Sequence, residues 1–281
     1  MASTLPDTAS PSKPLLGQRA VVSGSSLGIG RGIVIALAQA GADVTINYRS
    51  HQSQADEVAD VCRGYGVNAH VIAADMADPE AVERLVNEAT DAMGGLDIVV
   101  SNAAYSDRHL MLESDLSEIR KTIDVSMWGA FHLVRCGAQK LVDAGAGGNI
   151  VVISSPMGKV AMPGSMAYNM AKAANDQMAR TAAVELASHR IRVNIVHPGW
   201  IDTPGERKFF SEEKLQEEAL NLPWGRLGRV DEIGRGVVFL CDPASQYITG
   251  TTLTIDGGIQ LPFAEMYRVE EKRKLDAAAK K

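Results

Sequence analysis

The sequence predicts an α/β domain built on a doubly wound parallel sheet of about seven strands, with helices on both faces. Short apolar runs rich in Val and Ile alternate with longer segments whose apolar residues recur at helical spacing. Three of the first four runs are followed by a helix of crossover length. Because crossovers between parallel strands are right-handed and cover the sheet, we expect a sheet between two helical layers.

In the first half of the chain, an apolar run at residues 20–22 enters a glycine-rich turn. The turn leads into a helix at residues 31–38, which Gly41 ends. Asp78 and Pro79 supply an N-cap and a first-turn proline for a later helix. The remaining elements of this half are strands at residues 43–47, 69–73 and 97–100 and helices at residues 52–64 and 79–93.

In the second half, a long helix is expected from residue 115 to residue 143, where Phe131, Val134 and Leu141 form an apolar face. Gly147 and Gly148 then interrupt the helical pattern. The other expected elements are strands at residues 149–153, 192–196 and 252–255 and helices at residues 167–180, 204–223 and 231–241.

The domain organisation follows from the same pattern. No repeat or linker interrupts the sequence, so we expect one domain over residues 17–262. Residues 1–16 are rich in Ser, Thr and Pro and lack the apolar core of a signal peptide, which predicts a disordered leader. Residues 263–281 form a C-terminal extension, whose charged end is expected to be a solvated helix.

Composition excludes several classes of function. The formal charge of −6 argues against a nucleic-acid surface, and 46% hydrophobic residues are ordinary for a globular chain. Three widely spaced cysteines without a CxxC motif indicate reduced thiols, and hence the cytoplasm. No histidine spacing suggests a metal, and no apolar run approaches the ~20 residues of a membrane span. We therefore expect neither a metal site nor a membrane partner.

The glycine-rich turn has the spacing of a dinucleotide-binding fingerprint. Gly24 permits a tight turn, Gly28 lets the backbone approach a pyrophosphate, and Gly30 lets the next helix pack closely on the strand. The N-terminus of that helix offers amide donors and a partial positive charge to phosphates. Since the turn lies between a strand and a helix, as the fingerprint requires, the sequence predicts a dinucleotide site in a Rossmann-type fold.

The residues after the second strand indicate which cofactor is bound. An acidic side chain there would bind the ribose hydroxyls of NAD, but the chain has Tyr48, Arg49 and Ser50. Arg49 is suited to a 2′-phosphate, and Arg31 at the start of the first helix could add a second charge. This favours NADP, with use of NAD left open. After the third strand, Asp75 could accept a hydrogen bond from an adenine amino group.

Tyr168 and Lys172 are one helical turn apart and therefore share a face. A free tyrosine has a pKa of ~10, and a nearby ammonium group lowers it. Such a pair can exchange a proton with an alcohol or carbonyl oxygen. By itself the pattern is weak, because solvated pairs with this spacing are common. Its weight comes from the other motifs in the chain.

Together, the motifs resemble those of the classical short-chain dehydrogenase/reductase family over residues 18–261. Each motif is modest alone, but the ordered set is highly specific. The matching residues, in the family's order, are the glycine turn from Ser23 to Gly30, residues 101–104, Ser155, Tyr168, Lys172, Pro198, Gly199 and Thr203.

The resemblance implies an oxidoreductase that uses NAD(P) and that assembles as a homotetramer on its two long helices. Tyr168 is the implied acid/base, and Ser155 the group that holds the substrate oxygen. Lys172 is implied to lower the tyrosine pKa and to bind the nicotinamide ribose. The implied cofactor contacts are Gly24, Ser26, Gly28, Ile29, Gly30, Arg31, Tyr48, Arg49, Ser50, Asp75, Met76, Asn102, Ala103, Tyr168, Lys172, Pro198, Gly199, Ile201 and Thr203.

One position departs from the family pattern. Members usually carry an asparagine in the long helix, where it supports a water relay to the lysine, and this chain has Ser126 there. A serine donates and accepts a hydrogen bond but reaches less far. We include Ser126 among the expected catalytic residues, acting through its hydroxyl or its backbone carbonyl. The departure concerns the proton relay and not the hydride step.

Within the family, residues 46–49 and 256–259 resemble glucose 1-dehydrogenases and 3-oxoacyl-carrier-protein reductases. We expect hydride transfer between the cofactor and a secondary alcohol or ketone, or a sugar and its lactone, with the glucose 1-dehydrogenase type favoured. A 3-oxoacyl-carrier-protein reductase and a non-catalytic dinucleotide-binding homologue are the alternatives. Besides Ser155, the expected contacts with a small-molecule substrate are Met157, Met162 and Trp200, for which ordinary packing is the competing interpretation.

Overall fold

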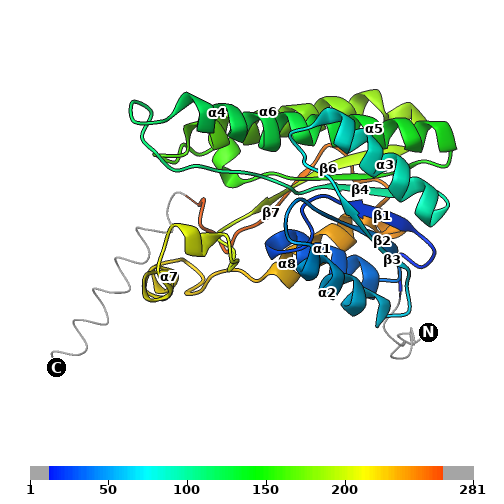
Figure 1. Cartoon of the computed structure of the whole chain (residues 1–281), viewed down its shortest axis with the longest axis horizontal. Helices are drawn as coiled ribbons and strands as arrows, with labels where there is room; N and C mark the ends of the chain where they lie inside the picture. The colour runs from blue at the N-terminus through cyan, green and yellow to red at the C-terminus, as the bar shows by residue number, and fades with distance from the viewer. Residues whose placement is uncertain (1–12, 262–281) are drawn as a thin grey trace, which may run out of the picture.

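The structure, a computed structural model, describes residues 13–261 (Figure 1). Its strands, all parallel, form one sheet in the order β3-β2-β1-β4-β5-β6-β7. The strands are β1 (Arg19–Val22), β2 (Asp43–Tyr48), β3 (Ala69–Ala73), β4 (Ile98–Ser101), β5 (Gly148–Ile153), β6 (Ile191–Pro198) and β7 (Thr252–Ile255). The predicted parallel sheet is confirmed, and each strand lies within two residues of its expected position.

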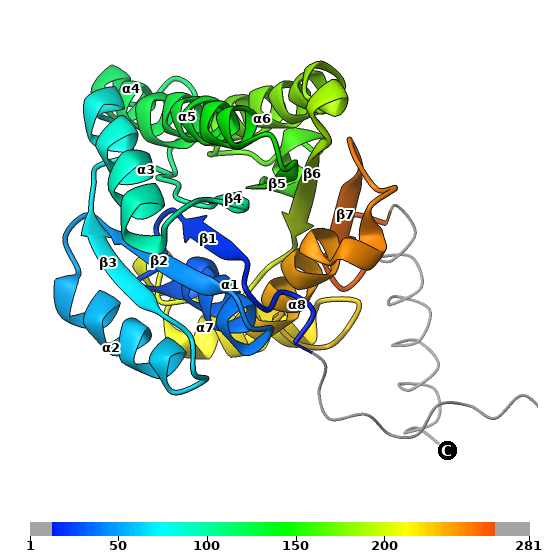
Figure 2. The ribbon, with the colours of Figure 1, turned by 90° about the vertical axis from the view of Figure 1, so that its right-hand side faces the viewer.

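Helices cover both faces of this sheet (Figure 1 and Figure 2). One layer contains α3 (Pro79–Met93), α4 (Leu116–Ile123), α5 (Gly129–Ala144) and α6 (Met166–Glu185). The opposite layer contains α1 (Gly28–Gln39), α2 (Gln52–Arg63) and α8 (Val230–Cys241). Figure 1 shows α7 (Glu212–Leu220) at the left-hand end of the sheet, where the loop before α4 also lies.

Two predicted helices differ in detail from the structure. The expected long helix of residues 115–143 is present without a break, and it consists of α4, a π-helical turn η1 (Asp124–Trp128) and α5. Such turns insert an extra residue into a helix and occur often at functional sites. The expected helix at residues 204–223 consists of a short 3-10 turn, η4 (Glu206–Lys208), followed by α7.

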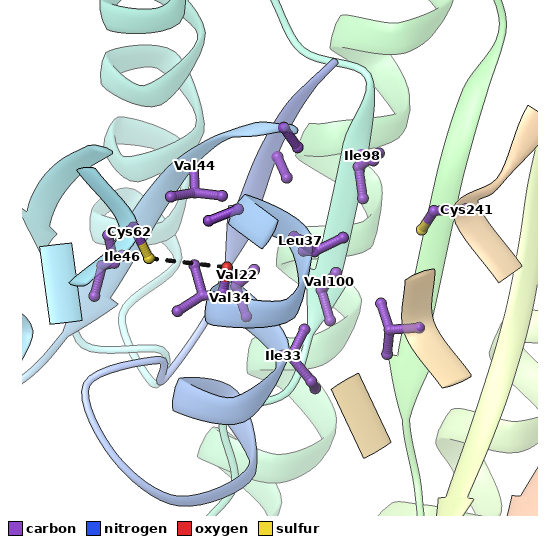
Figure 3. Packing of buried hydrophobic residues seen from close by; sticks show 14 of the residues in the cluster. Val22, Ile33, Val34, Leu37, Val44, Ile46, Cys62, Ile98, Val100 and Cys241 are labelled. Atoms are coloured by element: carbon purple, nitrogen blue, oxygen red, sulfur yellow. Dashed lines mark hydrogen bonds between the residues drawn. The ribbon is translucent and has the colours of Figure 1, made fainter. Parts of the chain in front are cut away.

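The sheet separates two apolar cores. In the first, Ile33 and Leu37 of α1 pack against Val22 and Val100 from neighbouring strands (Figure 3). The second lies under the opposite helices and includes Leu133 of α5. Burying each such aliphatic side chain stabilises the fold by about 1.5–3 kcal/mol relative to exposure. The cores therefore fix the positions of the strand ends that carry the candidate site.

The folded chain begins before residue 17. Leu15 is fully buried in the first core, and its N–H donates to the carbonyl of Ala40 over 2.9 Å. The predicted leader of residues 1–16 therefore extends too far along the chain. Residues 1–12 and the extension of residues 263–281 lie outside the described part. Within residues 13–261, no helix has the length and apolar character needed to span a bilayer.

The order of the strands reverses between β1 and β4. In open parallel sheets, ligands bind at such a point, beyond the carboxyl ends of the strands. The glycine turn follows β1 and Asn102 follows β4. Ser155 follows β5 and Gly199 follows β6. Because all the strands are parallel, the fold brings these four segments to one edge of the sheet.

Candidate active site

The glycine turn has the backbone geometry that its sequence predicts. Gly24 and Gly28 have φ angles of 60° and 56°, in the left-handed region that favours glycine. A Cβ atom at Gly30 would lie 2.3 Å from the carbonyl oxygen of Gly24 and 2.6 Å from Nδ2 of Asn102. A larger residue at Gly30 would therefore push the turn away from the sheet.

Two asparagines hold this turn. Asn102 donates from Nδ2 to the carbonyls of Ser23 and Gly24, at 2.9 and 3.1 Å. Asn47 accepts the Gly24 N–H through Oδ1 at 2.9 Å and donates to carbonyls at the end of β3. Asn102 was a predicted cofactor residue, and its amide group supports the turn. Asn47 was not predicted, although a buried asparagine near the end of an apolar strand was a signal for such a role.

The N-terminus of α1 is suited to bind a pyrophosphate. Its N-cap residue, Leu27, makes no side-chain cap, whereas Asp78 caps α3 by accepting from the amides of Glu80 and Ala81. The first amides of α1 therefore lack the side-chain acceptor that α3 has, and an anion can take its place. A Cβ atom at Gly28 would lie 3.6 Å from the Thr203 side chain. The turn after β6 thus faces the glycine turn, as a bound dinucleotide requires.

The expected ribose-binding residues lie at the ends of β2 and β3. Arg49 is exposed, and its guanidinium is 4.0 Å from the Asp75 carboxylate. Asp75 also accepts the Ala77 N–H over 2.9 Å. Arg31 and Ser50 are exposed as well. Arg49 is thus available to an anion, with Asp75 as its partner in the chain.

The other expected cofactor residues are divided between the site edge and the cores. Met76 and Ile201 are buried in the two cores, so only their backbones are open to a ligand, and Tyr48 packs partly against the first core. Ser26 and Pro198 are buried, and Ile29, Ala103, Gly199 and Thr203 are half-buried. A Cβ atom at Gly199 would lie 2.6 Å from Cα of Asp256, which explains the glycine there.

Ser155 and Tyr168 form the centre of the site. Ser155 caps the 3-10 turn η2 (Pro156–Gly158), and its Oγ accepts the Met157 N–H over 3.2 Å. The hydroxyl proton of Ser155 therefore remains available for a substrate oxygen. The Ser155 hydroxyl group is also close enough to Tyr168 to lower the tyrosine pKa. The two hydroxyl groups predicted to hold one substrate oxygen are therefore neighbours.

Burial and two charged side chains set the pKa of Tyr168. Burial raises the pKa of Tyr168 to about 12, and the Glu206 carboxylate adds to the rise. Arg108 and the interaction with Ser155 lower the tyrosine pKa but do not reverse the effect. The net pKa of Tyr168 therefore lies above its ordinary value in this structure, and the effect of Lys172 on it stays a prediction.

Lys172 is buried, and burial lowers its own pKa to about 8. Its ammonium group donates to the carbonyl of Ile153 over 2.8 Å and lies 5.3 Å from the centre of the Tyr168 ring. Asp176, one turn further along α6, opposes this shift and accepts from Nε2 of the buried His197 at 3.0 Å. The lysine is thus held beside the tyrosine ring and titrates closer to neutral pH than a solvated lysine.

Ser126 lies in the π-helical turn η1 and is fully buried. Its hydroxyl accepts the N–H of Tyr105 over 2.8 Å and donates to the carbonyl of the same residue over 2.7 Å. The Ser126 carbonyl accepts from Nδ2 of Asn175, at 2.8 Å. Oδ1 of Asn175 is buried and has no hydrogen-bond partner in residues 13–261. The sequence did not indicate Asn175, which joins η1 to the helix that carries Lys172.

A polar and aromatic cluster lies beside Tyr168. Glu206 Oε2 accepts from Trp200 Nε1 at 2.9 Å and from Arg108 at 3.4 Å. The Arg108 guanidinium stacks 4.1 Å above the ring of Phe209, and Phe210 packs against Trp200. Trp200 is a predicted substrate residue, whereas Arg108 and Glu206 were not predicted. Their positions depend on two loops that only the fold brings together.

Two further expected substrate residues follow Ser155 in the chain, and Met157 donates its N–H to the Ser155 hydroxyl. Met157 is half-buried, and Met162 is exposed. The described chain, residues 13–261, contains no cluster of three or more side chains able to hold a metal ion. A dinucleotide-dependent α/β enzyme, with hydroxyl groups poised for proton transfer, is the class of protein that this fold and site define.

Comparison with known proteins identifies the family. Residues 24–260 match the profile described as enoyl-(acyl carrier protein) reductase. L-rhamnose 1-dehydrogenase (NAD(P)(+)) from a Sphingomonas species is 34% identical, over 88% of this chain and 98% of that protein. The 3-oxoacyl-[acyl-carrier-protein] reductase of Staphylococcus aureus is 32% identical, over 86% of this chain and 98% of that protein. The chain belongs to the short-chain dehydrogenase/reductase family of NAD(P)-dependent oxidoreductases.

Solved structures agree with this assignment. A short-chain dehydrogenase from Burkholderia cenocepacia J2315, in complex with NADP, superimposes with a TM-score of 0.81. It is 35% identical in sequence, and the match covers 88% of this chain and 99% of that one. The similarity therefore extends over the whole sheet and its edge.

Proposed function

We propose that the protein transfers a hydride between NADP and a small secondary alcohol or ketone, with a sugar and its lactone as the favoured pair. The observation that carries the proposal is the pairing of Ser155 and Tyr168 at the sheet edge that also carries the glycine turn. The relative named L-rhamnose 1-dehydrogenase supports the sugar class, and the NADP complex supports the cofactor.

In this proposal the nicotinamide, when bound, accepts or supplies the hydride. Ser155 donates a hydrogen bond to the reacting oxygen, which lowers the cost of the charge that develops there. Tyr168 takes the hydroxyl proton when the alcohol is oxidised and returns it when the carbonyl is reduced. Lys172, with a pKa of about 8, is suited to pass that proton onward near neutral pH. The backbone carbonyl of Ser126, held by Asn175, is the group of η1 that would bind a water for this path.

The preference for NADP rests on Arg49. Its guanidinium is exposed at the end of β2, where a cofactor ribose is expected. A 2′-phosphate carries the charge that this guanidinium binds best. The 4.0 Å pair with Asp75 is long and exposed, so a phosphate can displace it at little cost.

A 3-oxoacyl-carrier-protein reductase is the second candidate, since the Staphylococcus aureus relative has this name. The third is a homologue that binds the cofactor without turnover. Initial rates of nicotinamide absorbance change separate the three, measured with aldoses, acetoacetyl esters and simple secondary alcohols. Tight cofactor binding without turnover of any of these compounds would favour the third candidate.

The decisive variant is Tyr168→Phe. It removes the hydroxyl that transfers the proton and keeps the ring, so we expect turnover to fall by at least about 100-fold, the usual worth of a general acid–base. Cofactor binding, followed by quenching of protein fluorescence, should stay within about threefold of the wild type. Retained turnover in this variant would refute the assignment of Tyr168.

We also propose a cytoplasmic homotetramer. The three cysteines are free, which suits a reducing compartment. Large apolar side chains are exposed on η1, α5 and α6, among them Trp128, Phe131 and Met170, and such patches often mark interfaces. Light scattering should give a mass four times that of the 30.0 kDa chain. A monomer at micromolar concentration would contradict this part of the proposal.

A further inference from the structure

The cluster beside Tyr168 contains a charged pair that the family motifs do not include. Arg108 comes from the loop between β4 and α4, and Glu206 from η4 after β6. Their side chains are 23% and 21% exposed, so both are only partly in contact with water. Each charge acts on Tyr168, with Glu206 raising and Arg108 lowering the tyrosine pKa. The pair therefore lies within electrostatic reach of the oxygen that transfers the proton.

The geometry of the pair leaves capacity for a ligand. Arg108 and Trp200 both donate to the same oxygen of Glu206, Oε2, and within residues 13–261 neither contact uses Oε1. The guanidinium contact is 3.4 Å long and involves one nitrogen, in contrast to a tight two-point pair. The guanidinium also stacks on Phe209, with its central carbon 4.1 Å from the ring centre, and this contact helps to hold it in place.

Such a pair selects among substrate classes. A fatty acyl chain lying over the pair would remove water from both charges without replacing its hydrogen bonds, which is costly. An anionic substrate would meet Glu206, and a cationic one would meet Arg108. A hydroxyl group satisfies both, because it donates to a carboxylate and accepts from a guanidinium. Trp200 and Phe210, whose ring centres are 5.3 Å apart, add flat apolar surface for the carbon skeleton.

We infer that Glu206 and Arg108 form a specificity-determining pair that binds a hydroxyl group near the reacting carbon of an uncharged, polyhydroxylated substrate. The inference rests on the proposed function and names the substrate class of the same site. During oxidation of an aldose, the C1–H bond breaks and its electron pair leaves as hydride to NADP⁺. The C1 hydroxyl proton passes to Tyr168, and a lactone remains. Glu206 and Arg108 hold a neighbouring hydroxyl group and take no part in bond breaking.

The test compares D-glucose with its 2-deoxy and 3-deoxy analogues, and with 2-butanol, by kcat/KM. In the wild type, we expect removal of one of the two hydroxyl groups to lower kcat/KM about 10- to 100-fold, as for a hydrogen bond to a charged group. In Glu206→Gln and in Arg108→Met, kcat/KM for the parent sugar should fall by a similar factor. In these variants, kcat/KM for the same deoxy analogue should differ from that for the parent sugar by less than about threefold.

The matched control is Glu212→Gln, the same substitution in the neighbouring surface pair with Arg207. It should preserve both kcat/KM and the ratio between parent and deoxy sugars. Any of three results would overturn the inference. The first is an unchanged ratio of kcat/KM between parent and deoxy sugars in both site variants, and the second is a loss of kcat/KM toward 2-butanol in both variants that equals the loss toward the sugar. The third is turnover of acetoacetyl esters or 2-butanol but of no aldose. Absence of turnover with every compound would instead refute the proposed function.

Discussion

The hydroxyl group of Ser126 bonds the backbone of Tyr105 in both directions, accepting its N–H at 2.8 Å and donating to its carbonyl at 2.7 Å. Ser126 thereby fixes the loop after β4 to the π-helical turn. The carbonyl of Ser126 is in turn held by Asn175 from α6. These contacts join the loop that carries Arg108, the turn and the helix that carries Lys172.

Replacing Ser126 by alanine should therefore destabilise the protein. The substitution leaves a partly buried N–H and carbonyl of Tyr105 without their partner, which costs about 1–3 kcal/mol. Urea denaturation measures the change in the free energy of unfolding. Ser188→Ala, at an exposed position, is the control and should change it by less than about 0.5 kcal/mol. Equal stabilities of the two variants would show that the contacts with Tyr105 contribute nothing.

Lys172 should make stability depend on pH in a defined window. Its pKa is about 8 in the folded chain and 10.5 ordinarily, so between these values the unfolded chain binds the extra proton. Stability therefore rises with pH across this window, as the cost of a buried charge disappears. The wild type should gain stability relative to Lys172→Met between pH 8 and about 10.5. Lys159→Met, which removes a lysine at an exposed site, is the control. Curves of stability against pH that run parallel for the wild type and Lys172→Met would contradict the lowered pKa of Lys172.

The two charges beside Tyr168 should shift the pH profile of alcohol oxidation in opposite directions. Glu206 raises the tyrosine pKa, so Glu206→Gln should lower it and move the rising limb of kcat/KM to lower pH. Arg108 lowers the tyrosine pKa, so Arg108→Met should move that limb to higher pH. The profiles are measured with 2-butanol as well as with a sugar. Shifts of the same sign in both variants would argue against direct electrostatic action on Tyr168.

Arg49→Asp should change the cofactor preference. The new carboxylate repels a 2′-phosphate and, as NAD-binding sites do, can accept from ribose hydroxyl groups. The ratio of kcat/KM for NADP to that for NAD should fall by at least about tenfold, the worth of one charge-assisted hydrogen bond. Arg84→Asp makes the same charge change at an exposed position on α3 and should leave the ratio unaltered. An unaltered ratio in Arg49→Asp would remove the support for NADP.

Motifs with local causes could be predicted from the sequence. The glycine turn works through backbone φ angles and close approach, and these depend on residue type at fixed spacing. The Tyr168–Lys172 spacing sets a shared helical face in the same way. The π-helical turn η1 within the long helix could not be predicted, because the residues from Asp124 to Trp128 follow an ordinary helical pattern. The groups that Ser126 contacts in this turn, Tyr105 and Asn175, come from distant parts of the chain.

The sequence by itself determined the sheet, its helical layers and the order of the catalytic motifs, because apolar periodicity and glycine spacing act over a few residues. Only the tertiary structure decided which distant groups surround those motifs. Arg108 and Glu206 lie far apart in the chain but meet beside Tyr168, and burial raises the tyrosine pKa. Contacts across loops and the loss of water depend on the packed fold, and no local pattern encodes them.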